Sequence, residues 1–216
     1  MSKTGRLNSR NIKDIFRYRK AGVEEFFKFF SVLVPLVEID GELFLLYEVR
    51  AKNMTRQPGE ICFPGGQMED GESPVECALR ETHEEIGILP EDVEVIAQLD
   101  TIYTYSNFAM HCFLGIVKEE AFENMALNPA EVDEVFLISV DRLIEEDPEV
   151  YTVKVRPHVP EGFPYDKVTG GQRYKWRSGK APVPIYDVDG RVIWGLTARI
   201  TKRFVDDIKD GAGCLR

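Results

Sequence analysis

The feature that most constrains the fold is a helix whose two ends are both marked in the sequence, over residues 74–86. Ser73 is a favourable N-cap residue, Pro74 suits the first helical position, and Glu76 completes a capping box with Ser73. Gly87 is a typical helix stop, because glycine readily adopts the left-handed conformation. The segment therefore predicts one helix with an apolar stripe at positions 75, 78, 79, 82 and 86.

A second face of this predicted helix gathers the carboxylates of Glu81, Glu84 and Glu85. At about 100° per residue, the three side chains fall within an arc of roughly 100°, away from the apolar stripe. Like charges at this spacing repel one another unless a cation lies between them. A hard divalent cation such as Mg²⁺ or Mn²⁺ is a natural partner, because it prefers oxygen ligands. Arg80 adjoins the cluster, where it can pair with a carboxylate and hold its rotamer.

Strands are expected on both sides of this helix. Asp40-Gly41 lies between two apolar runs and is a strong hairpin signal, which predicts strands near 31–38 and 42–50. Residues 59–63 predict a short strand, and Pro64-Gly65-Gly66 predicts a loop whose backbone can closely approach a ligand. Other apolar runs predict strands near 93–100, 108–117 and 134–140, a short helix over 140–146, short strands between 147 and 194, and a helix near 196–209. This order indicates an α/β fold with a mixed sheet between helices.

The N-terminal part differs from this pattern. Its apolar residues fall at mixed helical spacing and predict a helical extension over residues 1–30; they are Ile12, Ile15, Phe16, Phe26, Phe27 and Phe30. A length of 216 residues favours a single domain over 1–216. Near the other end of the chain, Trp194 is expected in the core.

Charge limits the partners that this chain can have. Thirty-seven Asp and Glu against 27 Lys and Arg give a net charge of −10, which repels nucleic-acid backbones. An anionic small molecule would meet the same repulsion unless a divalent cation lay between it and the carboxylates. No apolar run reaches the 18 or so residues of a membrane span, and residues 1–24 lack a secretory signal. The four cysteines show no metal-ligand spacing, so we expect a cytoplasmic protein with reduced thiols, and a homodimer is left open.

The helix belongs to a longer pattern over residues 66–88, in which Gly66, Glu72, Arg80-Glu81, Glu84-Glu85 and Gly87 stand at fixed spacing. This pattern resembles the Nudix box, and the chain resembles a Nudix hydrolase. The resemblance implies an α/β/α sandwich with a mixed β-sheet, a loop-helix-loop catalytic motif, and hydrolysis of a nucleoside diphosphate linked to another moiety. It further implies that Glu81, Glu84, Glu85 and the carbonyl oxygen of Gly66 bind Mg²⁺ or Mn²⁺, and that Arg80 orients these catalytic carboxylates.

The residues before the box resemble those of one branch of the Nudix family. Arg50, Gly59 and residues 63–66 match the signature of coenzyme A diphosphatases, whereas Thr55 and Gln57 stand where Arg and His are usual. The resemblance implies cleavage of coenzyme A or its derivatives to adenosine 3′,5′-bisphosphate and a phosphopantetheine. ADP-ribose, NADH or another nucleoside diphosphate derivative stays open as the alternative substrate. A non-catalytic ligand sensor is a third possibility, against which the intact box carboxylates argue.

Five further residues are candidates for catalysis or substrate binding. Glu131 either caps a turn or reaches the metal site as a ligand or general base. Arg50 and Arg56 could bind phosphates, because the guanidinium fork matches phosphate oxygens. Arg173 lies in residues 163–180, where aromatic and cationic side chains concentrate; this segment predicts either a substrate contact or an edge strand or interface. Gly65 is expected to approach the substrate through its backbone.

Overall fold

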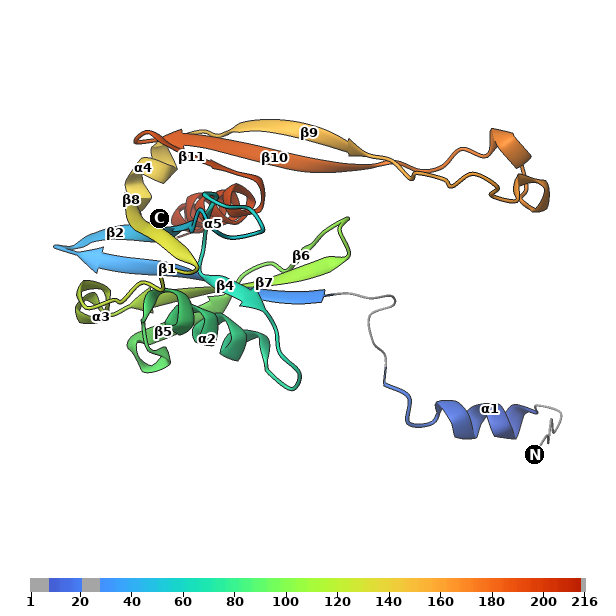
Figure 1. Ribbon diagram of the computed structural model, residues 1–216, viewed down its shortest axis with the longest axis horizontal. Helices are drawn as coiled ribbons and strands as arrows, with labels where there is room; N and C mark the ends of the chain where they lie inside the picture. The colour runs from blue at the N-terminus through green and yellow to red at the C-terminus, as the bar shows by residue number, and fades with distance from the viewer. Residues whose placement is uncertain (1–7, 21–27, 215–216) are drawn as a thin grey trace.

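The computed structural model describes residues 8–20 and 28–214, and the second of these segments forms a layered α/β structure (Figure 1). Its helices and strands are, in chain order, α1 (Ser9–Phe16), β1 (Lys28–Ile39), β2 (Glu42–Arg50), β3 (Ile61–Cys62), β4 (Gly65–Gln67), α2 (Pro74–Ile86), β5 (Val93–Gln98), β6 (Ile102–Tyr103), β7 (Phe108–Val117), α3 (Glu119–Glu123), β8 (Val132–Ser139), α4 (Val140–Glu145), β9 (Glu149–Val155), β10 (Gly179–Val188), β11 (Arg191–Trp194) and α5 (Gly195–Cys214). Three short 3₁₀ turns are η1 (Pro90–Asp92), η2 (Tyr165–Lys167) and η3 (Gly171–Arg173).

The main sheet is mixed, as the sequence predicts. Its central path runs β3-β2-β1-β7-β5, with β8 paired to β2, β4 to β1 and β6 to β7. Strand β1 runs parallel to β7 and antiparallel to β2. The hairpin between β1 and β2 turns at Asp40 and Gly41, whose φ angles of 51° and 81° match a turn with two left-handed residues. The predicted hairpin is therefore confirmed.

Helices cover both faces of this sheet. Helix α2 packs on one face through an apolar cluster that includes Leu33, Ala78, Ile86 and Phe113. Helix α5 packs on the other face and is itself covered by the three-stranded sheet β11-β10-β9 (Figure 1). The buried hydroxyls of Tyr47 and Thr201 lie 2.9 Å apart and join the main sheet to α5. The predicted α/β/α sandwich is confirmed, with the second sheet as an additional layer.

Helix α2 has the predicted bounds. Glu76 accepts the backbone N–H of Ser73 at 2.8 Å, and the Ser73 hydroxyl accepts the N–H of Glu76 at 3.4 Å, so the capping box closes. At the other end, Gly87 has φ 77° and donates its N–H to the carbonyl of His83 at 2.9 Å. Local chemistry thus fixes both ends of the helix that carries the candidate site.

The helical extension predicted over residues 1–30 is wrong at its C-terminal end. Helix α1 forms and has no buried residue, but Lys28, Phe29 and Phe30 belong to strand β1. Phe30 packs edge-on against Phe108 of the parallel strand β7, with ring centroids 5.2 Å apart. This cross-strand packing is a tertiary contact that helical spacing alone does not indicate. Phe26 and Phe27 lie outside the described residues.

Three other expectations need correction. Gly65 and Gly66 form strand β4 rather than a loop, because they pair with Val32 and Ser31 of β1. The strands between 147 and 194 are not all short, since β10 has ten residues. Trp194 is not in the core, because it lies in β11 at the surface and is 50 % exposed. No helix of the described segments combines the length and apolarity needed to cross a membrane.

The capping box gives a stability prediction. Ser73→Ala removes the side-chain oxygen that caps α2 and should lower the free energy of unfolding by about 1 kcal/mol. For a domain of this size such a loss lowers the melting temperature by roughly 2–4 °C. Ser73→Thr is the control, because threonine keeps the hydroxyl that caps the helix and donates to Glu76, and it should retain most of the stability. Equal melting temperatures for the alanine variant and the wild type would contradict the assigned cap.

Candidate active site

Arg80 holds three carboxylates together on the outer side of α2. Its Nε and Nη2 donate to the two carboxylate oxygens of Glu72 at 2.8 and 3.1 Å. Its Nη1 donates to Glu81 and to Glu84, both at 2.9 Å. The pairing with Arg80 lowers the pKa of Glu72 to about 2. Arg80 thus links the helix to the turn that precedes it and fixes the rotamers of two box carboxylates.

Glu85 is buried, although it follows Glu84 on the same helix. Its side chain turns toward the sheet, and its Oε2 accepts the backbone N–H of Gly65 at 2.8 Å. Burial raises the pKa of Glu85, and the nearby charge of Glu48 raises it further. The carboxylates of α2 therefore do not share one solvated face, and the Glu85 side chain lies between the helix and β4.

Glu48 is a site residue that the sequence analysis missed. It lies in β2, is 1 % exposed, and accepts the thiol hydrogen of Cys62 at 3.1 Å. Its Oε2 has no hydrogen-bond partner among the described residues. Burial raises the pKa of Glu48, and the charges of Glu131 and Glu81 add to that effect. The available signal was an acidic residue within the apolar run of β2, which is unusual for a buried strand.

Glu131 and Arg50 join the same group of charges. Glu131 precedes β8, and its carbonyl accepts the N–H of Ala51 at 2.8 Å, which places it beside the end of β2. Its charge contributes to the raised pKa values of Glu81 and Glu85. Arg50 acts in the opposite direction and lowers the pKa of Glu48. The Nε of Arg50 is buried and has no hydrogen-bond partner within the described segments. A cation and several carboxylates thus meet at this end of β2.

The two glycines of β4 serve the packing of these carboxylates. A Cβ on Gly66 would overlap the carboxylate of Glu81, so the Glu81 carboxylate lies directly against the glycine backbone. The thiol of Cys77 also makes a long contact of 3.7 Å with the carbonyl of Gly66. Gly65 has φ 154°, and a Cβ there would overlap the backbone of Ser31 and Val32. Its N–H is already bound to Glu85.

The remaining predicted residues lie farther out. Arg56 is exposed in the loop between β2 and β3, which also contains Thr55 and Gln57. Arg173 lies in η3 at the far end of the β9–β10 hairpin, well away from α2 (Figure 1). The structure thus brings together Arg50, Gly65, Gly66, Arg80, Glu81, Glu84, Glu85 and Glu131, and leaves Arg173 outside the group.

The donor set of this group fits a hard divalent cation. Its carboxylate and carbonyl oxygens are the ligands that Mg²⁺ and Mn²⁺ prefer, and the buried, unpartnered oxygen of Glu48 lies among charges that repel it. Among the described residues no three acidic, His or Cys side chains already converge as a ligand set. The hydrogen bonds explain this, because the guanidinium of Arg80 holds Glu81 and Glu84. Rotation of those two side chains would free their oxygens for a cation.

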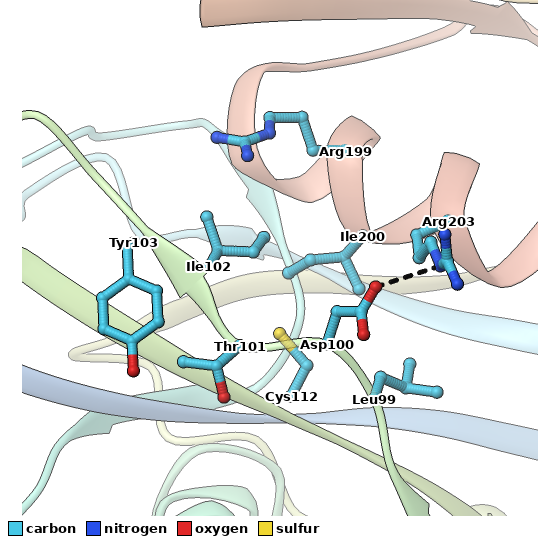
Figure 2. Close-up of a pocket in the computed structure, with 9 residues that line it drawn as sticks. All are labelled: Leu99, Asp100, Thr101, Ile102, Tyr103, Cys112, Arg199, Ile200 and Arg203. Carbon is cyan, nitrogen blue, oxygen red and sulfur yellow. Dashed lines mark ion pairs between the residues drawn. The ribbon is translucent and has the colours of Figure 1, made fainter.

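A separate pocket of about 260 Å³ lies between β6, β7 and α5, on the sheet face opposite α2 (Figure 2). Arg203 pairs with Asp100 at 3.2 Å across one side of it, and Ile102 and Ile200 supply an apolar wall. None of the box carboxylates lines this pocket. The lining thus combines Arg199 and the Arg203–Asp100 ion pair with apolar side chains, and composition or spacing gave no sign of it.

Comparison with known proteins agrees with this arrangement. Residues 28–156 match the family described as the NUDIX domain. Nudix hydrolase 3 of Caenorhabditis elegans is 41 % identical over 118 residues, which are 54 % of this chain and 49 % of that protein. The peroxisomal coenzyme A diphosphatase NUDT7 of Mus musculus is 38 % identical over 126 residues, 58 % of this chain and 52 % of its own.

Longer matches extend beyond the box. The mitochondrial coenzyme A diphosphatase NUDT8 of Mus musculus is 30 % identical over 174 residues, covering 80 % of this chain and 74 % of that protein. A crystal structure of a MutT/nudix family protein from Enterococcus faecalis has a TM-score of 0.51 at 15 % identity, over 94 % of this chain and 70 % of the other. The chain spans about half the length of the first two relatives. With the NUDIX match over more than half of its residues and the box carboxylates assembled on α2, this chain belongs to the Nudix family.

Proposed function

We propose that this chain hydrolyses the diphosphate linkage of coenzyme A or its derivatives, giving adenosine 3′,5′-bisphosphate and a phosphopantetheine. The observation that carries the hydrolase assignment is the group of carboxylates around Glu85, next to the cation of Arg50. Support for the coenzyme A branch comes from the names of two relatives and from Arg50, Gly59 and residues 63–66, which fit the branch signature. Residues Glu81, Glu84 and Glu85, with the carbonyl of Gly66, would hold Mg²⁺ or Mn²⁺.

Each residue of the candidate site would have its own role in the hydrolysis. A bound divalent cation supplies charge neutralisation at the phosphates and a more acidic water. Glu131 would accept the proton of an attacking water or serve as a further ligand, a role supported by the effect of its charge on Glu81 and Glu85. Arg50 would bind a phosphate oxygen, for which its guanidinium fork is suited. Arg80 keeps Glu81 and Glu84 in place through its hydrogen bonds to both.

The alternative substrates are ADP-ribose, NADH or another nucleoside diphosphate derivative. The specific observation in their favour is the loop between β2 and β3, where Thr55 and Gln57 depart from the coenzyme A signature. Gln57 donates its side-chain amide to Glu60 at 2.9 Å and so is used within the loop. The partner is in either case a small molecule, and a cytoplasmic location stays a prediction, since the relatives' names include peroxisomal and mitochondrial.

The first experiment is a product screen with Mg²⁺ or Mn²⁺ against coenzyme A, ADP-ribose, NADH and nucleoside triphosphates. We expect adenosine 3′,5′-bisphosphate from coenzyme A, and a loss of at least about a hundredfold in kcat for Glu85→Gln. Glu131→Gln should lower kcat with little change in KM. Glu134→Gln is the matched control, because Glu134 lies in β8 but binds Arg191 at 3.0 Å instead. Tenfold better kcat/KM for ADP-ribose or NADH would reject coenzyme A, and an active Glu85→Gln would reject the site.

The two arginines predicted to bind substrate can be compared directly. Arg50→Ala removes a cation beside the carboxylates, so KM for coenzyme A should rise roughly ten- to a hundredfold, the value of one charge-assisted hydrogen bond. Arg173→Ala removes a cation at the far end of the hairpin and should change KM less within an isolated chain. Steady-state kinetics of both variants gives the answer. A larger effect at Arg173 would contradict the placement of the phosphates beside Arg50.

The buried carboxylates also predict a pH dependence of stability. Burial raises the pKa values of Glu48 and Glu85 above those of the unfolded chain, so the folded state binds more protons at neutral pH. Stability of the metal-free protein should therefore fall as pH rises from about 5 to 9, by roughly 2–4 °C in melting temperature for each kcal/mol lost. Glu85→Gln should show a smaller fall. The lowered pKa of Glu72 acts in more acidic solution, outside this range. A wild-type melting temperature independent of pH would contradict the burial of these charges.

A further inference from the structure

The β9–β10 hairpin projects from the body of the protein (Figure 1). Strand β11 pairs only with the Ile185–Val188 end of β10, so the outer part of the hairpin has two strands. Both faces of β9 are exposed, and Val150, Tyr151 and Val153 are 51, 55 and 47 % exposed. A two-stranded hairpin is only marginally stable alone in water, and exposed apolar side chains often mark a binding surface. Both features indicate that the hairpin binds a partner.

The end of the hairpin has its own packing. The ring of Trp176 lies edge-on to those of Phe163 and Tyr174, with centroids 5.6 and 5.2 Å away. The indole N–H of Trp176 donates to the hydroxyl of Tyr165 at 3.2 Å. This aromatic cluster gives the tip a defined shape, so the hairpin presents a formed surface.

The two edges of the hairpin differ in their hydrogen-bonding capacity. Pro182 and Pro184 of β10 stand opposite Thr152 and Val150 of β9. Proline has no N–H, so we assign these positions to the pairs whose backbone groups point away from the neighbouring strand. Val150, Thr152 and Lys154 then direct their N–H and C=O groups to the free edge of β9. The outer edge of β10 lacks donors at both prolines, whereas the edge of β9 is open.

Charge separates the tip of the hairpin from its base. Residues 154–180 contain seven Lys and Arg against two Asp and Glu, while the rest of the chain contains 20 against 35. The base of the hairpin is acidic, and four of the five residues 145–149 are Asp or Glu. Within β9 itself, Glu149 is at the base and Lys154 near the tip. The hairpin is thus complementary in charge to its own reversed copy.

We propose that the free edge of β9 docks a second copy of this chain, with the two β9 strands antiparallel about a two-fold axis near Thr152. Thr152 would then face the partner's Thr152, and Val150 the partner's Lys154. Each of these pairs exchanges both backbone hydrogen bonds, because all three residues point their backbone groups outward. Antiparallel docking also sets the basic tip of each hairpin beside the acidic base of the other. The same patch serves both copies, as a two-fold interface requires.

Sedimentation equilibrium tests this directly, since the monomer has a mass of 24.7 kDa. The wild type should be a dimer whose dissociation constant rises with salt. Thr152→Pro removes one outward N–H without touching the bonds to β10, and should raise the dissociation constant at least tenfold. Thr152→Val keeps the N–H and the β-branched shape, and should remain dimeric. Hydrogen exchange of residues 149–155 should slow with protein concentration in the wild type and in Thr152→Val only.

Each other outcome overturns the proposal. A wild type that is monomeric at about 100 µM, well above a typical micromolar affinity, excludes the second copy as the occupant. A monomer that binds a labelled oligonucleotide through the basic tip would assign the hairpin to an anionic partner instead. A dimer that Thr152→Pro leaves intact, with unchanged exchange in β9, would place the interface elsewhere. Circular dichroism of both Thr152 variants shows that the fold is retained, and the result does not depend on the substrate.

Discussion

The contact between the Glu85 carboxylate and the Gly65 N–H holds the candidate site in place. It joins helix α2 to strand β4, and β4 in turn pairs with β1 at the centre of the main sheet. Gly65 and Gly66 permit this close approach, because a side chain at either position would overlap β1 or Glu81. The sheet, the glycine strand and the helix are therefore positioned by one buried carboxylate that is also a candidate metal ligand.

The carboxylates on the outside of α2 and the buried carboxylates of the candidate site differ in how far a cation offsets their charge. On the outside of α2, Arg80 pairs with Glu72, Glu81 and Glu84 through short hydrogen bonds and offsets part of their negative charge. Inside, Glu48 and Glu85 have lost water, and the charge of Arg50 offsets the effect of burial on Glu48 only in part, so the charged forms of both carboxyls are disfavoured. A cation bound at this place would offset the cost of burying these negative charges, so the folded chain is expected to bind one. The catalytic proposal and the pH dependence of stability both come from this one imbalance.

The elements that the sequence predicted well are those set by local chemistry. Both ends of α2 follow from a capping box and a terminal glycine, and the first hairpin follows from Asp40-Gly41. Contacts between distant segments were not predictable in this way: Glu48 enters the site only because the fold brings β2 close enough for its charge to act on Glu85, and Phe30 is in a strand because β7 runs next to it. Arg173 illustrates the same limit, since a basic aromatic segment does not reveal that a long hairpin carries it away from the helix.

Pro182 and Pro184 also affect how many chains can join through strand pairing. A sheet with two open edges can add chains at both sides without end, as fibrils do, whereas a sheet with one blocked edge can only close on itself. In two copies joined along β9, the outer side of the two-stranded part of each hairpin would be the proline-bearing part of β10. Strand pairing would therefore add no third chain. A protein with a long, exposed hairpin could then stay dimeric at high concentration and would not form fibrils.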